Sequence, residues 1–475
     1  MAQRAWVFAA GFTFAWSVCG VVCCDAHRES QRANDTDAPR AGGELASERP
    51  VATTDSAEPG SQPAPAPITV ESKPAQLDVD GDDDPTSDES GLPLGAGHFE
   101  RVGRPPAALQ RICDLTPLGA ALYGAHATRP LGLDGATISR YRLADPRPWS
   151  IAFDWNRAGE PTKGGGAGQG FLRVHAIAGR LFVPDADPPY NGFGFSEPGT
   201  EGFVFVSTPE GEFVRARMPG HLPPRAPDAV GKAGAAVLPR AYHVIDVIRF
   251  RGNVYAATGG VPPGERAWHG ASPGALLVES EIGARFAYAV DYPRPYRAGV
   301  WRLTFLVRFR DRLYAGIQDY DQVEPNDYVY FEPPRDRMLI TQDDVHAVRV
   351  TEGGTAQTLR WYADGGNLYW IAWNREGVAL RVSNDGDHWQ IVPLPNDLGV
   401  PTDIVRFRGA LHVLTSRGLL RLDGATPTVL ARIGEKRSPF ELDDSFCAAP
   451  LAVFQGELYA GGQRDGALYR FKPDI

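Results

Sequence analysis

Short apolar runs that alternate with glycine-centred turns recur along residues 99–475. The repeated pattern is an apolar run, Phe, any residue, Gly, any residue, Leu or Val, Tyr and a small residue. Two apolar runs around a tight turn predict a β-hairpin. Five copies are clear and two, the first and the fifth, are weaker; in chain order they span Leu118–Gly124, Val174–Val183, Val247–Ala256, Val307–Ala315, Tyr362–Trp370, Val405–Val413 and Val453–Ala460.

Each copy belongs to a larger unit that predicts four strands. The first run is apolar on both faces, as at Val247, Ile248 and Phe250, which indicates a strand buried between neighbours. A second, weaker hairpin follows, for example at residues 418–422. Four strands per unit, repeated along the chain, are typical of β-propeller blades. We therefore predict an all-β fold, a β-propeller of seven four-stranded blades, with six or eight blades left open.

The two ends of the repeat region predict that the ring closes on itself. The last unit stops at residues 471–475, one strand short. Ahead of the first unit, residues 99–105 parallel an outer strand at residues 389–395. We expect the segment from Phe99 to supply the missing strand, because pairing there would remove two exposed sheet edges.

One turn carries a family resemblance. The segment Asn384-Asp-Gly386-Asp-His-Trp389 resembles an Asp box, the turn of BNR-type bacterial β-propellers. In that family the acidic or amide side chain caps the turn and the Trp packs between blades, so the resemblance implies a structural role. Val382 stands where the family has Ser or Thr. Sialidases share the box, but their arginine triad, nucleophilic Tyr with its Glu, and Arg-Ile-Pro segment cannot be assigned in this chain.

The N-terminus predicts export. Residues 1–24 combine a short basic start with an uncharged, mostly apolar stretch, as in secretory signal peptides or membrane anchors. The end of this stretch resembles the lipobox of bacterial lipoproteins, with Cys24 or Cys23 as the lipidated residue, although Val22 or Cys23 stands where Gly, Ala or Ser is usual. Lipid anchoring, simple cleavage and an uncleaved helix all remain open. We expect an exported, membrane-tethered, periplasmic or secreted protein of the bacterial cell envelope.

Charge separates a linker from the folded region. The chain has a formal charge of −10, and residues 25–98 contain 16 acidic and five basic side chains. We predict that residues 25–98 are a disordered acidic linker rich in Pro and Ala, and that residues 99–475 form the propeller. Residues 99–475 hold 42 acidic and 42 basic groups, so nucleic acid is not an expected partner. Asp78, Asp80 and Asp82 alternate as in a calcium loop, but a solvated acidic run is the simpler interpretation, and no cofactor or metal is expected.

Two sets of residues in the folded region have alternative roles. Cys113 and Cys447 precede inner strands of the first and last units, so they form either a disulfide across the closing seam or two buried thiols. Three aspartates recur near the start of inner strands: Asp114, Asp246 and Asp403. They either surround the channel mouth, where they would meet a cation or ligand amine, or cap neighbouring backbone amides, as is more usual.

Arginines at the hairpin turns suggest a second surface. Arg-Phe-Arg occurs in three units, and the second arginine of each, Arg251, Arg310 or Arg408, falls in the turn. A ring of these three arginines on one face, here called the arginine crown, could bind an anionic partner. Arginine outnumbers lysine 43 to five along the whole chain, however, so a general preference for arginine explains these residues equally well.

Long aromatic insertions after the second strand of units two, three and four provide the main functional indication. The candidate ligand-binding residues are Tyr190, Phe193, Trp268, His269, Tyr320, Asp321 and Tyr328. Aromatic faces beside carboxylates suit sugar rings, cationic groups or peptides. We therefore predict a monomeric, non-enzymatic recognition or scaffold module that binds a glycan, peptide or protein. The alternative is a polysaccharide hydrolase or lyase that uses carboxylates among Asp319, Asp321, Glu324 and Asp327, if two of them converge.

Overall fold

The computed structural model describes residues 93–474 except for several loops. All described residues belong to one compact unit. The predicted signal region, the lipidation candidates Cys23 and Cys24, and the acidic run Asp78–Asp82 lie outside the described residues. The omitted positions within 93–474 are 108, 128–135, 156–169, 186–203, 216–243, 252, 261–274, 282–284, 292–300, 320–326, 333–345, 351–355, 423–426 and 435–437.

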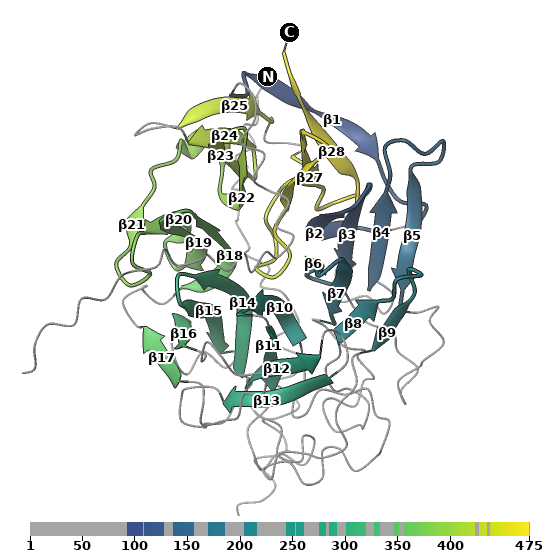
Figure 1. Cartoon of the computed structure of the whole chain (residues 1–475). Helices are drawn as coiled ribbons and strands as arrows, with labels where there is room; N and C mark the ends of the chain where they lie inside the picture. Colours follow the sequence, from purple (N-terminus) through teal and green to yellow (C-terminus); the bar gives the residue numbers. More distant parts are fainter. Residues whose placement is uncertain are drawn as a thin grey trace, which may run out of the picture. The chain divides into compact units, whose positions relative to one another are not determined.

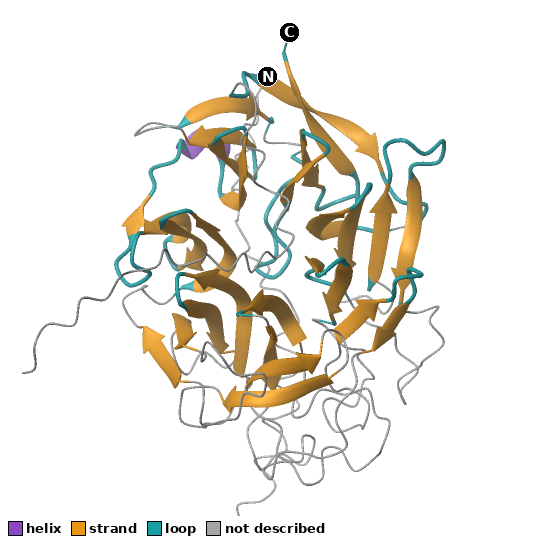
Figure 2. Ribbon diagram, viewed as in Figure 1, coloured by secondary structure: helices purple, strands orange, loops and turns teal. Residues whose placement is uncertain are grey.

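The described chain is an all-β propeller in which antiparallel sheets surround a central axis (Figures 1 and 2). Helical structure in these residues is limited to one 3-10 turn, Asn396–Leu398. The first two sheets have four strands each and run in chain order from the axis outward. They comprise β2 (Arg111–Leu118), β3 (Ala121–Ala127), β4 (Thr137–Tyr141) and β5 (Trp149–Asp154), then β6 (His175–Ile177), β7 (Arg180–Pro184), β8 (Val204–Ser207) and β9 (Phe213–Arg215).

The next sheet has eight strands and corrects the predicted blade count. The structure has six sheets, not seven, because β11 extends past its partner β10 and pairs through Gly259 and Gly260 with Arg302 and Trp301 of β14. Two successive four-stranded meanders are thereby joined. They are β10 (Val244–Phe250), β11 (Asn253–Gly260), β12 (Ala275–Glu281) and β13 (Arg285–Asp291), then β14 (Trp301–Phe309), β15 (Arg312–Asp319), β16 (Asp327–Glu332) and β17 (His346–Val350).

The remaining three sheets again have four strands each. The fourth contains β18 (Gln357–Asp364), β19 (Asn367–Asn374), β20 (Gly377–Ser383) and β21 (Gln390–Ile391). The fifth contains β22 (Pro401–Phe407), β23 (Ala410–Thr415), β24 (Gly418–Leu422) and β25 (Thr428–Arg432). The last contains β26 (Leu451–Phe454), β27 (Glu457–Gly461), β28 (Leu468–Pro473) and β1 (Gly97–Gly103).

Pairing of β1 with β28 confirms the predicted ring closure. Phe99 lies opposite Phe471 in an antiparallel register, so the first strand of the propeller completes the last sheet. Leu94, ahead of β1, is buried in the core beside the fifth and last sheets. The folded region therefore begins a few residues earlier than the predicted boundary at residue 99. The inner strands contact one another around the ring in the order β2, β6, β10, β14, β18, β22, β26 and back to β2.

The Asp-box segment adopts the capped turn that its resemblance implied. Asp385 Oδ1 accepts hydrogen bonds from the backbone amides of Asp387 and His388 at 2.9 and 2.8 Å. These bonds hold the pKa of the Asp385 carboxyl well below its usual range. Gly386 has φ +84°, and a Cβ there would collide with the Tyr314 hydroxyl, so only glycine fits. Ser383 supplies the hydroxyl that Val382 cannot, because Ser383 Oγ accepts the Gly386 amide at 2.8 Å.

Candidate functional site at the ring axis

Each of the three recurring aspartates joins its own inner strand to a backbone amide in, or just before, the inner strand of the following unit. Each Oδ2 accepts a backbone amide across that interface: Val174 to Asp114 at 3.0 Å, Leu306 to Asp246 at 2.8 Å and Leu451 to Asp403 at 2.7 Å. Every one of these aspartates follows a register shift in its strand. Such a bulge re-aims the side chain along the ring. The amide-capping interpretation is therefore the one the structure supports.

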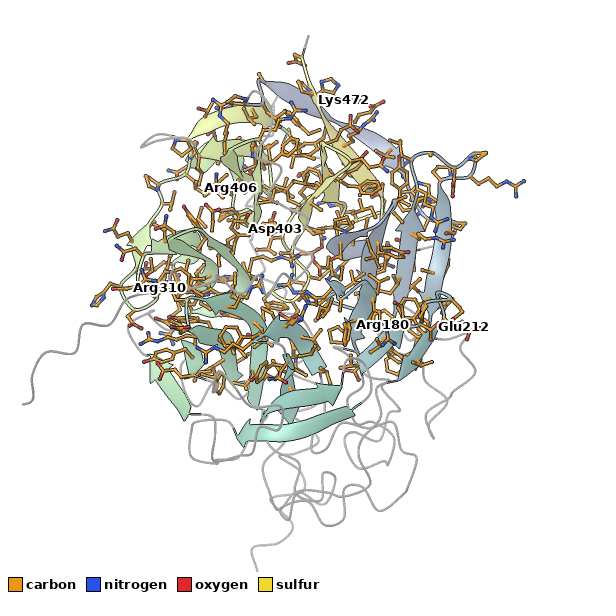
Figure 3. All side chains as sticks on the ribbon, in the orientation of Figure 1. Arg180, Glu212, Arg310, Asp403, Arg406 and Lys472 are labelled. Carbon is orange, nitrogen blue, oxygen red and sulfur yellow. A yellow bond between two sulfur atoms is a disulfide. The ribbon has the colours of Figure 1, made fainter. Side chains whose placement is uncertain are left out.

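Arginine or histidine side chains contact the other oxygen of the same carboxylates. Arg360 of β18 reaches across the axis, where its Nη1 lies 3.3 Å from Asp114 Oδ1 and its Nη2 donates to the Cys113 carbonyl at 2.6 Å. The Nε of Arg360 lies 3.7 Å from Asp403 Oδ1. Arg173 Nη1 lies 3.5 Å from Asp114 Oδ1, and His175 Nε2 lies 2.6 Å from Asp246 Oδ1. The axis is thus filled by a network of buried charges, and Figure 3 places Asp403 within it.

Burial raises the pKa of two of these carboxylates, Asp403 and Asp246. It raises the pKa of Asp403 to about 6, although the Arg360 guanidinium and the amides of Leu451 and Ile404 favour the charged form. Burial also raises the pKa of Asp246, and the His175 contact opposes this shift. Because each of the three aspartates accepts an amide across an interface between sheets, their role is structural.

A loop between β25 and β26, residues 438–450, crosses this network and is here called the strap. Its Cys447 forms a disulfide with Cys113 of β2, with the two Cα atoms 4.5 Å apart. The partners are 334 residues apart in the chain and link the first and last sheets. Ser445 Oγ lies 2.6 Å from Gln357 Nε2 of β18. Strap contacts therefore reach opposite sides of the ring.

The strap also places two carboxylates on a buried arginine. Arg111, which begins β2, is 2% exposed. Its Nη2 lies 3.2 Å from Asp443 Oδ1 and its Nη1 donates to Asp444 Oδ2 at 2.9 Å. Arg111, Arg173, Arg302 and Arg360 were not among the site residues predicted from the sequence. The available signal was an arginine within or beside the start of several inner strands.

Most of the predicted ligand-binding residues cannot be placed. Tyr190, Phe193, Trp268, His269, Tyr320 and Asp321 lie outside the described residues, as does Glu324. Among the alternative catalytic carboxylates, Asp319 ends β15 and Asp327 begins β16, so their backbones lie at the same end of this strand pair. The loops that contain the six unplaced ligand-binding residues leave the sheets at the end where the inner strands begin, which is also the end that carries the strap.

Tyr328 is described, and its position corrects its predicted exposure. The side chain is 0% exposed, and its hydroxyl donates to the Gly386 carbonyl at 3.0 Å and accepts Trp389 Nε1–H at 2.9 Å. Its ring contacts Trp361, Trp370 and Trp389 edge to face. Tyr328 faces the core because strand alternation places it beneath the Asp-box turn, so it belongs to the packing between sheets.

At the opposite end of the sheets, the Arg-Phe-Arg arginines bind the next turn rather than forming a free arginine crown. Arg251 donates to the Asp311 carbonyl at 3.0 Å, Arg310 to the Asn384 carbonyl, and Arg408 to the Gly456 carbonyl at 3.4 Å. Each guanidinium also lies over the Phe that precedes it, at 4.9 to 5.2 Å from the ring centroid. These arginines therefore connect adjacent turns.

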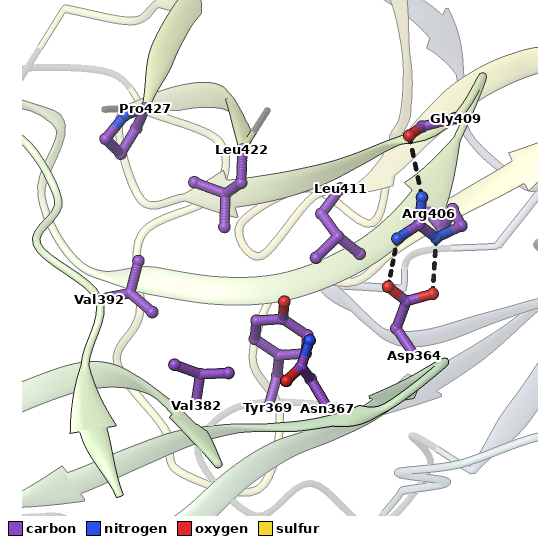
Figure 4. A pocket seen from close by; sticks show the side chains of 10 residues that line it. All are labelled: Asp364, Asn367, Tyr369, Val382, Val392, Arg406, Gly409, Leu411, Leu422 and Pro427. Carbon is purple, nitrogen blue, oxygen red and sulfur yellow. Dashed lines mark hydrogen bonds and ion pairs between the residues drawn. The ribbon is translucent and has the colours of Figure 1, made fainter. Parts of the chain in front are cut away.

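A pocket of about 340 Å³ lies at this turn end between the fourth and fifth sheets (Figure 4). Its polar side is an ion pair of Arg406 with Asp364, and Arg406 Nη1 also donates to the Gly409 carbonyl at 2.9 Å. Its apolar lining continues the core between the two sheets: Tyr369, Val382, Val392, Leu411, Leu422 and Pro427.

No group of metal-ligating side chains occurs in the described part of the chain, and no helix in that part is long and apolar enough to cross a membrane.

No protein-family model and no curated protein match this chain. Among solved structures, a catalytically inactive virginiamycin B lyase from Staphylococcus aureus with quinupristin is 9% identical, covers 79% of this chain and 98% of its own, and has a TM-score of 0.46. The polysaccharide lyase Uly1 is 8% identical, with coverage of 80% and 100% and a TM-score of 0.39. The β-propeller domain of the Trilobed protease from Pyrococcus furiosus is 8% identical, with coverage of 69% and 99% and a TM-score of 0.31. Similarities at this level say nothing about what this chain binds or catalyses.

Proposed function

We propose that this protein is an exported recognition module in which a rigid propeller presents ligand-binding loops from one end of its sheets. The observation that carries the proposal is the use of the described axial carboxylates. Asp114, Asp246 and Asp403 each accept a backbone amide from a neighbouring inner strand. Carboxylates committed in this way support a frame, and function in such folds resides on the loops.

The disulfide supports export. Disulfides persist in oxidising compartments and are rare where glutathione keeps thiols reduced. Cys113 and Cys447 are both buried and joined, as an exported protein permits. Together with the signal-like residues 1–24, this pair favours a cell-envelope location, with lipid anchoring through Cys24 or Cys23 as part of the proposal.

The loops after β7, β11 and β15 are the proposed recognition surface. They leave the sheets at the strap end and contain the aromatic and acidic residues Tyr190, Phe193, Trp268, His269, Tyr320 and Asp321. A glycan, a peptide or a protein with exposed rings or cationic groups would match this composition. A monomer is part of the proposal.

Array-binding measurements on the unchanged protein and on loop variants test this proposal. The full chain, purified from the envelope of an expressing bacterium, is applied to glycan and peptide arrays, and Trp268→Ala/Tyr320→Ala is compared with Ile391→Ala. Ile391 is a matched apolar control because it is 65% exposed on β21, an outer strand of the fourth sheet, whereas the loops follow β7, β11 and β15 of other sheets. We expect the double variant to lose at least tenfold in affinity while the control binds as the unchanged protein does.

The same experiment decides the alternative of a polysaccharide hydrolase or lyase. New reducing ends or unsaturated products from an array polysaccharide, abolished by Asp321→Asn, would overturn the recognition proposal. Retention of array binding by the Trp268/Tyr320 variant would overturn the assignment to these loops.

A further inference from the structure

Residues 443–446 of the strap are held at the axis by the kinds of contact that hold a bound ligand. Its carboxylates, Asp443 and Asp444, meet Arg111 at 3.2 and 2.9 Å. The Arg111 side chain is 2% exposed, whereas the two aspartate side chains are 29% and 39% exposed. A buried guanidinium therefore faces carboxylates that are themselves reached by solvent. A planar guanidinium of this kind is well suited to carboxylate recognition.

An aromatic side chain follows the carboxylate pair and fills a second subsite. The ring of Phe446 lies 6.1 Å from the ring of Phe305 in an edge-to-face arrangement, and the Arg302 guanidinium lies 5.4 Å from the Phe446 centroid. Arg173 covers Phe305 at 4.0 Å. Inner-strand residues of β2 and β14, together with Arg173, thus form a receptor for a carboxylate pair with an aromatic residue two positions after it.

Two buried anchors hold the strap on either side of this segment. Phe440 is 0% exposed and packs against Phe99 at 4.9 Å, and Cys447 is 1% exposed in the disulfide. The residues between the anchors, 441–446, are all partly or fully exposed. Displacement of this segment would break the contacts of Asp444, Ser445 and Phe446 without breaking those of the two anchors.

We propose that the axis at the strap end is a binding site for an acidic peptide with two adjacent carboxylates and an aromatic residue two positions later, and that strap residues 441–446 occupy the site until such a peptide displaces them. The inference rests on the proposed function only in assigning recognition to this end of the sheets, and it names the ligand class. Because the strap competes for the site, the apparent affinity for the peptide is the intrinsic affinity multiplied by the fraction of molecules in which the site is open.

The experiment supplies the segment in trans. The probe is the peptide Glu-Leu-Asp-Asp-Ser-Phe, and the site is emptied by Asp443→Asn/Asp444→Asn in the full chain. We expect the peptide to bind this variant at least tenfold more tightly than the unchanged protein and to raise its Tm, whereas a peptide with both Asp replaced by Asn does neither. Asp145→Asn/Asp397→Asn is the matched control, because it removes the same charge at exposed ion pairs formed with residues outside the strap, Arg142 and Arg432.

Further variants keep the proposal falsifiable. Ser445→Ala removes the contact with Gln357 without unpairing a charge, so it should show a smaller gain if the Asp443/Asp444 variant does not fold. Adding Arg111→Gln should abolish peptide binding. Equal binding by the Arg111→Gln protein, preference for oligogalacturonate over the peptide, or no peptide binding by any folded strap variant would overturn the inference. Array binding that depends on Trp268 and Tyr320 and is unaffected by Arg111→Gln would leave the proposed function standing alone.

Discussion

The two ends of the sheets use arginine and aspartate for different purposes. At the strap end, Arg111 and Arg360 are 2% and 5% exposed and pair with carboxylates across the axis. At the turn end, Arg251, Arg310 and Arg408 reach neighbouring turns at the surface. Removing one partner of a buried pair leaves an uncompensated charge, whereas exposed pairs contribute little. Arginines are present at both ends, but we expect the stability of the closed ring to depend mainly on the buried ion pairs at the axis.

Replacing Arg360 should produce the largest loss of stability. Arg360→Met keeps much of the side-chain volume but leaves Asp114 and Asp403 without the cation that spans them. Breaking a buried ion pair on one side costs about 3–5 kcal/mol of the free energy of unfolding. Urea denaturation of the full chain, followed by tryptophan fluorescence, measures this cost.

Arg310→Met is the matched control at the turn end. Its guanidinium lies at the surface on the Asn384 carbonyl and over the Phe309 ring. We expect a loss of under about 1 kcal/mol, as for other exposed interactions. Equal losses for Arg360→Met and Arg310→Met would show that the two ends contribute alike and would remove the contrast between them.

Removing the disulfide should have the second-largest effect. Cys113→Ser/Cys447→Ser releases the strap from β2 while β1 still pairs with β28, so we expect a folded but weaker ring. Loss of a native disulfide costs about 2–5 kcal/mol. Thermal unfolding with and without reductant measures it: reductant should lower the Tm of the unchanged protein toward that of the double variant. A Tm unaffected by both changes would show that strand pairing alone closes the ring.

The sequence predicted repeated elements better than it predicted their connections. The propeller, the closing strand from Phe99 and the capped turn at Asp385 follow from local patterns of apolar and turn residues, which act over a few positions. The junction of β11 with β14 depends on two glycine backbones meeting a strand about 40 residues later, and no local pattern marks such pairing. Tyr328 was predicted to lie in an aromatic and acidic insertion after the second strand of its unit, whereas it lies in β16 and faces the core.

At the axis, the spacing of Asp114, Asp246 and Asp403 was visible in the sequence, but their cationic partners were not. Arg360 and Asp114 are 246 residues apart and meet only because the ring brings β18 and β2 to opposite sides of one axis. A contact of this kind requires the closed fold. The sequence therefore identified the carboxylates but not the cationic side chains that pair with them.

A further predicted effect is a pH dependence carried by Asp403. Its pKa is raised to about 6 in the folded protein, from an ordinary value of 3.8, because of burial. Between these values the folded state binds more protons than the unfolded state, so the contribution of Asp403 to stability falls as pH rises from about 4 to 6. The difference corresponds to about 3 kcal/mol at neutral pH. Asp385 acts in the opposite sense, because its lowered pKa gives stability that is present above about pH 4 and lost below it.

The opposing contributions make a difference measurement necessary. Free energies of unfolding at pH 4, 5, 6 and 7 are compared between the unchanged protein and Asp403→Asn. Asn accepts only one of the two amides that Asp403 binds, Ile404 and Leu451, so the variant should be less stable than the unchanged protein at pH 4. The gap between the two proteins should nevertheless narrow by about 2–3 kcal/mol as pH rises, since only the carboxylate carries the burial cost. Parallel curves would mean that Arg360 and the amides fully compensate the buried charge, and the axis would then resemble the turn end in its insensitivity to charge.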